Sequence, residues 1–234
     1  PSTLIRSCNV KRTLAFEPQE RCDAQWFEHT PEGVREASAT AYMFARKLYE
    51  VLKVPVGIIN VSWGGSRIEA WMKEDLLRKD FAEIDMSHID SKVMPAVSPF
   101  KSASMLYNGM LHSVAGYTAK GFVWYQGCAN VANPSQYRRL QPAFVQMLRS
   151  EWQNEHMPFY YTQLAPHKSH TPDMMWIQSL NSYEIPNSAM ATTHDLGDYT
   201  CGHPANKKDL GDRLAYLALT RDYGMNVIDA MVPM

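Results

Sequence analysis

Short apolar runs alternate along this chain with segments in which apolar residues recur every three or four positions. The strongest run, 121–125, is rich in β-forming residues and leads directly into a polar loop at 126–130. A second apolar run, 54–61, is followed by two consecutive glycines. The main helix-like segments are 38–52, 135–153 and 204–223. This alternation predicts a doubly wound, mostly parallel sheet with helices on both faces.

Length and composition indicate one α/β domain that spans residues 1–234, with two small domains as the alternative. The chain has 234 residues, of which 45% are hydrophobic, enough for one sizeable core. Within it we expect an irregular lead-in at 1–36 and a long loop at 79–100. The net charge of −1 argues against a nucleic-acid partner. No apolar run approaches the roughly 20 residues of a membrane span.

The four cysteines are too few for a disulfide scaffold, and no pair has the spacing of metal ligands. An even number permits two disulfides, as in an exported protein, or four buried free thiols. Composition leaves both possibilities open. The sequence therefore gives no reason to expect a metal.

Three loops that follow apolar runs contain residue types suited to acyl transfer. They are 63–66, 126–130 and 195–203, and parallel strands would bring all three to one edge of the sheet. Backbone N–H groups and a side-chain amide can hold a developing oxyanion. A histidine can act as general base near neutral pH.

An ordered set of motifs resembles the sialate O-acetylesterase-like carbohydrate esterases of the SGNH (GDSL-type) hydrolase superfamily. The matching stretches are VPVGIIN at 54–60, WGGSRIEAW at 63–71, LYNGM at 106–110, WYQG at 124–127, DLGD at 195–198, and His203-Pro204 with Asn206-Lys207. The resemblance implies a flavodoxin-like three-layer α/β/α fold. It also implies hydrolysis of acetyl esters on sugars without a metal or organic cofactor, in a secreted or periplasmic protein.

Site residues are carried over from the family by position. His203 matches the catalytic histidine, and Gly64 or Gly65 matches the oxyanion glycine. Gln126 and Asn130 lie in the stretch that supplies a side-chain amide to the oxyanion. The substrate implied is an acetylated carbohydrate, of the sialate or xylan type.

The chain departs from the family at the nucleophile, since it has no Gly-Gln-Ser-Asn-Met motif. That serine follows the first strand of the fold, which is central in the sheet. Without this strand, two strand edges should be left unpaired. We therefore expect the natural protein to supply the serine from a preceding segment, or else to have compensated for its loss.

Two further departures concern the partner of the histidine and the cysteines. Related hydrolases place an aspartate three residues before the histidine, where this chain has Thr200. Asp195, Asp198 or a backbone carbonyl is expected to orient His203 instead. Cys128 and Cys201 lie on loops that should meet, which suggests a disulfide or a close thiol pair.

The leading hypothesis is a carbohydrate O-acetylesterase that uses a Ser-His mechanism. The alternative is a non-catalytic carbohydrate-binding or scaffold domain that keeps the fold without the nucleophile. A third hypothesis is hydrolysis that depends on Cys128 as the nucleophile. Ser62 and Ser66 are weaker substitutes, because a serine in a tight turn ordinarily has a structural role.

Overall fold

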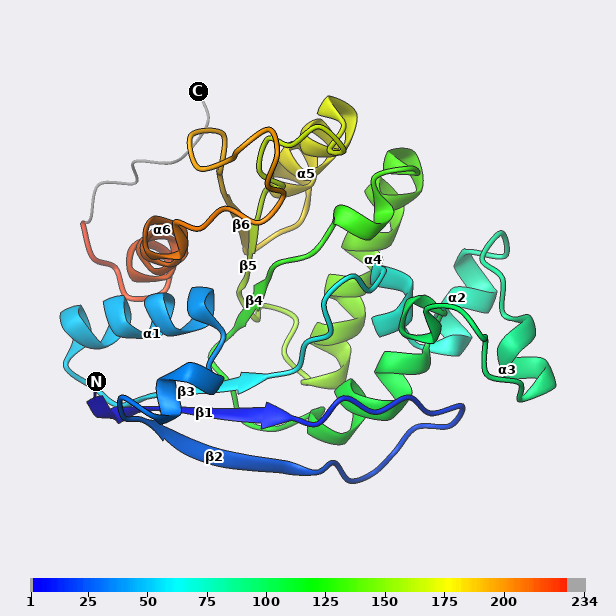
Figure 1. The fold of residues 1–234 in the computed structure, drawn as a ribbon, viewed down its shortest axis with the longest axis horizontal. Coiled ribbons are helices and arrows are strands. Elements are labelled where there is room, and N and C mark those ends of the chain that lie inside the picture. The colour runs from blue at the N-terminus through cyan, green and yellow to red at the C-terminus, as the bar shows by residue number, and fades with distance from the viewer. Residues whose placement is uncertain (1, 227–234) are drawn as a thin grey trace.

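Two three-stranded sheets form the middle layer of the computed structural model, which describes residues 2–226 (Figure 1). The first sheet has the order β2-β1-β3, and the second has the order β4-β5-β6. The strands are β1 Ser2–Val10, β2 Ala24–His29, β3 Val56–Asn60, β4 Phe122–Trp124, β5 Phe159–Thr162 and β6 Ser188–Ala191. The helices are α1 Ala39–Leu52, α2 Glu74–Asp80, α3 Ser87–Ser91, α4 Pro134–Glu151, α5 Pro172–Glu184 and α6 Lys207–Arg221.

All strand pairs but one are parallel. Strands β4, β5 and β6 run in parallel, with Trp124 opposite Tyr161 and Tyr161 opposite Met190. Strand β1 is parallel to β3 and antiparallel to β2. Helices α1 and α6 pack together on one face, and α4 and α5 pack together on the other (Figure 1). The predicted three-layer α/β/α fold is therefore confirmed.

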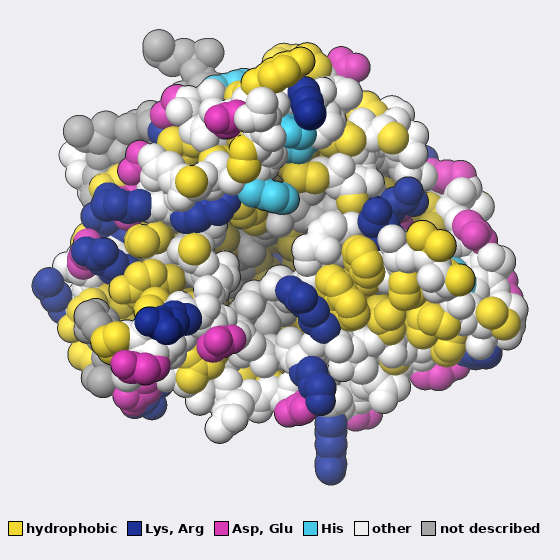
Figure 2. All heavy atoms as spheres, viewed as in Figure 1, with side chains coloured by type: hydrophobic (Ala, Val, Ile, Leu, Met, Phe, Trp, Pro, Cys, Tyr) yellow, Lys and Arg dark blue, Asp and Glu magenta, His cyan; other side chains and the backbone are white. Residues whose placement is uncertain are grey.

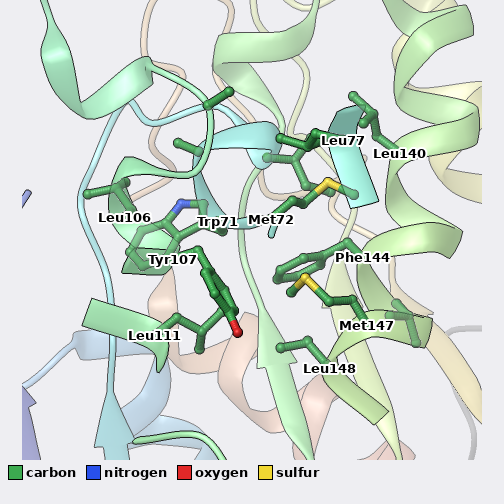
Figure 3. Close-up of a cluster of buried hydrophobic side chains, with 14 of the residues drawn as sticks. Trp71, Met72, Leu77, Leu106, Tyr107, Leu111, Leu140, Phe144, Met147 and Leu148 are labelled. Carbon is green, nitrogen blue, oxygen red and sulfur yellow. The ribbon is translucent and has the colours of Figure 1, made fainter. Parts of the chain in front are cut away.

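The largest hydrophobic core lies between α4 and the segment 68–111 (Figure 3). Phe144 of α4 and Tyr107 are almost completely buried there. The polar end of Tyr107 is satisfied, because its hydroxyl donates to Glu151 Oε2 at 2.7 Å. This core fixes the segment that connects β3 to β4, and the beginning of that segment, just after β3, reaches the candidate site.

The region 1–36 is not the irregular lead-in that the sequence suggested. It contains β1 and β2, which pair continuously from Arg6 opposite Glu28 to Val10 opposite Ala24. Its polar residues obscured the pattern, because β2 is an edge strand whose first half is exposed. The region 79–100 also differs from prediction, since it contains the end of α2 and the short helix α3.

The facing edges of β3 and β4 are not paired with any strand among the described residues. Strand β3 has β1 as its single neighbour, and β4 has β5. In β4, Val123 is 38% exposed, whereas every residue of β5 is buried. The unpaired strand edges expected from the sequence are thus present in the middle of the layer.

Candidate active site

The loops that follow β3 and β4 are in direct contact at one edge of the sheet layer. The backbone N–H of Ile68 donates to Asn130 Oδ1 at 3.0 Å. The side-chain amide of Gln126 donates to the carbonyl oxygen of Ser66 at 3.0 Å. The sequence prediction that these two loops meet is borne out by these bonds.

Asn130 is the centre of a buried polar network that includes Glu69. Its Nδ2 donates to Glu69 Oε2 at 2.9 Å, while its Oδ1 also accepts from Gln126 Nε2 at 2.7 Å. Asn130 and Glu69 are both buried. Glu69 is a residue that sequence reasoning missed as part of the site, although it lies within the WGGSRIEAW stretch.

The two glycines after β3 present free backbone to the site. Gly65 has a φ of 78°, in the left-handed region that favours glycine. No described group accepts a hydrogen bond from the N–H of Gly64 or of Gly65. A side chain at Gly64 would meet nothing within 4 Å. Both N–H groups are therefore available to an oxyanion.

Ser66 and Cys128 are poorly suited to act as nucleophiles in this geometry. Ser66 is buried, and its Oγ accepts a hydrogen bond from Trp71 Nε1 at 2.9 Å. Burial raises the pKa of the Cys128 thiol, so that less of the reactive thiolate forms. Ser66 instead fastens the turn to the buried ring of Trp71.

Asp195 attaches the loop 195–203 to helix α6 through Arg213. Both of its carboxylate oxygens accept from the guanidinium of Arg213, with Oδ1 at 2.7 Å from Nη1. Arg213 also donates to the carbonyl oxygen of Thr192 at 2.8 Å. The hydrogen bonds from Arg213 lower the pKa of Asp195. The carboxylate of Asp195 is therefore already bound by Arg213, apart from any role in orienting a histidine.

Asp198 and His203 lie on the exposed part of the same loop. Asp198 Oδ1 accepts from the N–H and the hydroxyl of Thr200, both at 2.7 Å, and these bonds lower its pKa. Among the described residues, none makes a hydrogen bond or ion pair with the ring of His203. The assignment of His203 as base, and of either aspartate as its partner, stays a prediction.

Cys128 and Cys201 are free thiols in the structure, so the expected disulfide is not formed. Lys207 nevertheless lies near both cysteines, and its ammonium group would attract the thiolate form of either one. Helix α6 begins at Lys207 and not at 204 as predicted, because the side chain of Asn206 caps it by accepting a hydrogen bond from the N–H of Asp209. Burial lowers the pKa of Lys207.

Gln178 of α5 is a second residue that sequence reasoning missed. It is completely buried and accepts from the N–H of Leu164 at 2.8 Å. Its amide nitrogen also lies 3.4 Å from the carbonyl oxygen of Gln126. Gln178 thereby joins the loop after β5 to the loop after β4. As one polar residue after an apolar run in a helix, Gln178 gave no sign of this role in the sequence.

The face of the molecule seen in Figure 2 is hollowed near its middle, with His side chains on one rim and Lys or Arg side chains around it. Across residues 2–226, no group of three His, Cys, Asp or Glu side chains could hold a metal ion. No helix in the same range is long and apolar enough to cross a membrane.

A three-layer α/β/α fold with free glycine N–H groups and an amide network beyond its strand ends has the donors that a hydrolase needs to hold an oxyanion. Residues 14–220 match the model of a family described as carbohydrate esterase, sialic acid-specific acetylesterase. The chain therefore belongs to this carbohydrate esterase family.

Relatives of known name agree with this assignment. The chain is 31% identical to the sialate O-acetylesterases of Pongo abelii and Homo sapiens, over 94% and 86% of its length. A crystal structure of a carbohydrate acetylesterase from Xanthomonas citri is 30% identical, covers 97% of the chain and superposes with a TM-score of 0.85. A protein from Arabidopsis thaliana shares the fold at 15% identity and a TM-score of 0.58.

The chain spans about half the length of the esterases that it matches. It covers 47% and 43% of the two primate esterases and 51% of the Xanthomonas citri chain. Because about half of each of these esterases lies outside the match, their activity is proposed for this chain and is not assigned to it.

Proposed function

We propose that this chain forms part of a carbohydrate esterase that removes O-acetyl groups from sugars by a Ser-His mechanism. Family membership supports the reaction class, and the geometry of the strand-end loops supports the chemistry. The observation that carries the proposal is the direct contact between the Gly64-Gly65 loop and the Gln126–Asn130 loop.

In the proposed reaction, the serine hydroxyl attacks the acetyl carbonyl while His203 accepts the hydroxyl proton. The C–O bond to the sugar breaks, and His203 returns the proton to the leaving sugar oxygen. Water then attacks the acetyl-serine, with His203 again as base, and acetate is released. Asp195 or Asp198 is the candidate to orient His203 after a rearrangement of the exposed loop.

Hydrogen-bond accounting favours Asn130 over Gln126 as the amide that holds the oxyanion. Both N–H bonds of Gln126 Nε2 are engaged, one with Ser66 and the other with Asn130. Among residues 2–226, Glu69 is the one acceptor of Asn130 Nδ2, so the second N–H of this amide is left for the oxyanion. The N–H of Gly64 or Gly65 would supply the other donor.

We infer that the serine lies on a strand outside residues 1–234 and that this strand pairs between β3 and β4. A strand there would satisfy the free backbone groups of both edges and join the two sheets into one. If it ran parallel to its neighbours, its carboxyl end would reach the edge that carries Asn130 and His203.

The test measures hydrolysis of a chromogenic acetate and of an O-acetylated sugar. Residues 1–234 alone should be inactive, whereas the same chain joined to a strand segment containing Gly-Gln-Ser-Asn should be active. His203→Ala and a serine-to-alanine change in the added segment should each abolish the gain. Activity of residues 1–234 alone that disappears in Cys128→Ala would instead establish the thiol mechanism.

The alternative function is a carbohydrate-binding or scaffold domain without catalysis. It is favoured by the absence of a serine motif from this sequence. Sugar binding without hydrolysis, even with the added segment, would decide for it. We also propose a secreted or periplasmic location, on the strength of the family, which fractionation of cells producing the natural protein would test.

A further inference from the structure

Polar contacts tie the segment 195–207, which carries His203, to the segment 122–130 through one side chain, that of Lys207. Its ammonium nitrogen lies 5.1 Å from the centroid of the Tyr125 ring and 3.5 Å from the hydroxyl oxygen of that ring. Across the described residues, no other side chain or backbone group of the first segment makes a hydrogen bond, ion pair or cation–π contact with the second. Lys207 is therefore the polar contact that relates the histidine loop to the amide loop.

Tyr125 connects this contact to the candidate oxyanion amides. The residue directly follows β4 and directly precedes Gln126. Its ring packs against the hydrophobic cluster of α6, which includes Leu210 and Leu214. Burial raises the pKa of the Tyr125 hydroxyl to about 12, so the ring is neutral at neutral pH and presents its face to the cation. A contact with this ring thus acts on the start of the amide loop.

The connection from Lys207 back to His203 is short and restrained. Three residues separate the two, and Pro204 among them is buried, with its φ restricted by its own ring. Asn206 is held as the cap of α6, because its side chain accepts from the N–H of Asp209 at 3.1 Å. A displacement of Lys207 would therefore be passed on to His203.

Lys207 occupies a place that local energetics do not favour for a cation. The N-terminus of a helix carries a positive partial charge, which repels a lysine in the first turn. Burial also disfavours the ammonium form, and it lowers the pKa of Lys207. Lys208, in the same turn, is compensated by Asp212 at 2.6 Å, whereas Lys207 has no ion pair within residues 2–226. A charge at such a place is typical of a functional site.

We propose that Lys207 is a positioning residue, which holds His203 in place relative to the oxyanion amide through its contact with Tyr125. The proposal rests on the proposed function and adds the group that fixes its base and its oxyanion donors in one arrangement. Proton transfer and charge stabilisation require such groups to be held within a fraction of an ångström. In this role Lys207 acts through His203 and does not touch the substrate.

The kinetics of a catalytically competent chain test the role. In residues 1–234 joined to the serine-bearing segment, Lys207→Met should lower kcat about 10- to 100-fold and change KM by less than about twofold. Lys207→Arg, which keeps the cation, should restore most of the activity. Lys208→Met is the matched control, because Lys208 is the next residue and is paired with Asp212, and it should leave kcat unchanged. A raised KM with unchanged kcat in Lys207→Met would overturn the proposal, since the lysine would then bind substrate.

Substitutions of Tyr125 show whether Lys207 acts through the ring. Tyr125→Leu removes the ring and should lower kcat as much as Lys207→Met does, whereas Tyr125→Phe keeps the ring and should lose less. The double variant Lys207→Met/Tyr125→Leu should be no slower than either single variant, because both substitutions break the same contact. Losses of kcat that multiply in the double variant would contradict a shared role.

A measurement on residues 1–234 alone separates this proposal from the proposed function. Backbone amide relaxation measured by NMR gives the order parameter of the His203 amide group. This order parameter should fall in Lys207→Met and in Tyr125→Leu, and it should stay unchanged in Lys208→Met. Thermal melting checks that each variant is folded.

The two sets of results fail independently. An active enzyme in which neither Lys207→Met nor Tyr125→Leu changes kcat or the order parameter of His203 would keep the esterase function and reject the positioning role. Absence of hydrolysis by every chain, together with a loosened His203 in both variants, would reject the esterase function and leave Lys207 as the residue that holds this loop.

Discussion

Asn130 Nδ2 donates to Glu69 Oε2 across 2.9 Å, and this bond joins the loop after β4 to the turn after β3. The two residues are 61 positions apart in the sequence. Both are buried, so neither can exchange its partner for water without opening the site. The acidic side chain therefore fixes the orientation of the amide that we propose as an oxyanion donor.

Glu69→Ala should destabilise the chain by about 1–3 kcal/mol, because Asn130 loses its buried acceptor. Urea unfolding measures this loss. Glu83→Ala is the matched control, since Glu83 pairs with Arg139 at the surface and should contribute less than about 1 kcal/mol. Equal effects of the two changes would contradict the structural role of Glu69. In the competent esterase, Glu69→Ala should also lower kcat more than it raises KM.

Asp195→Ala should cost about 1–3 kcal/mol, because it leaves the buried guanidinium of Arg213 without its carboxylate. The side chain of Arg213 is 8% exposed, whereas that of Asp195 is 62% exposed, which keeps the expected loss moderate. Asp23→Ala removes a fully surface pair with Lys11 and should change stability by at most about 0.5 kcal/mol.

The Asp195–Arg213 pair also predicts a pH dependence of unfolding. The folded-state pKa of Asp195 lies below its ordinary value of 3.8, so the pair contributes fully above that pH. Its contribution is lost as the pH falls through the lowered pKa. Stability curves of the wild-type chain and Asp195→Asn should therefore converge in acid. Parallel curves down to the lowest pH measured would show that the pair does not form.

Gln178→Leu should destabilise the chain by about 1–3 kcal/mol, since the buried N–H of Leu164 loses its acceptor. Hydrogen exchange at Leu164 should accelerate more than exchange in α4, because the loop after β5 is released locally. Gln19→Leu, at an exposed position, is the control and should leave both measurements nearly unchanged. Uniform acceleration of exchange throughout the chain would point instead to a global loss of stability.

The sequence alone predicted the layers and the meeting of the strand-end loops, because apolar periodicity reports which residues face a core. It missed Glu69 and Gln178, because a single polar residue in a helical segment looks like a solvated one until its burial is known. It also missed β2, where edge exposure permits polar residues on a strand. The missing pairing between β3 and β4 was anticipated from the absent serine motif, not from the strands themselves.

The unpaired edges predict self-association of residues 1–234. Free N–H and C=O groups on β3 and β4 form a template for pairing with another chain. Sedimentation velocity should show concentration-dependent association, and Val123→Lys should reduce it because a charge on an edge strand opposes pairing. Val123 is 38% exposed, so the substitution should cost little stability. Association that persists unchanged in Val123→Lys would place the contact away from β4.

Lys207→Met should leave the fold at least as stable as the original at neutral pH. Burial lowers the pKa of Lys207 below its ordinary value of 10.5, which means that folding disfavours its charged form. The unfolded chain binds the proton more tightly, so stability should rise with pH between the folded-state pKa and about 10.5. Lys207→Met should lack this rise, as thermal melting across alkaline pH would show. If Lys207→Met were clearly less stable at neutral pH, the contact of the ammonium group with Tyr125 would stabilise the fold by more than burial of its charge destabilises it.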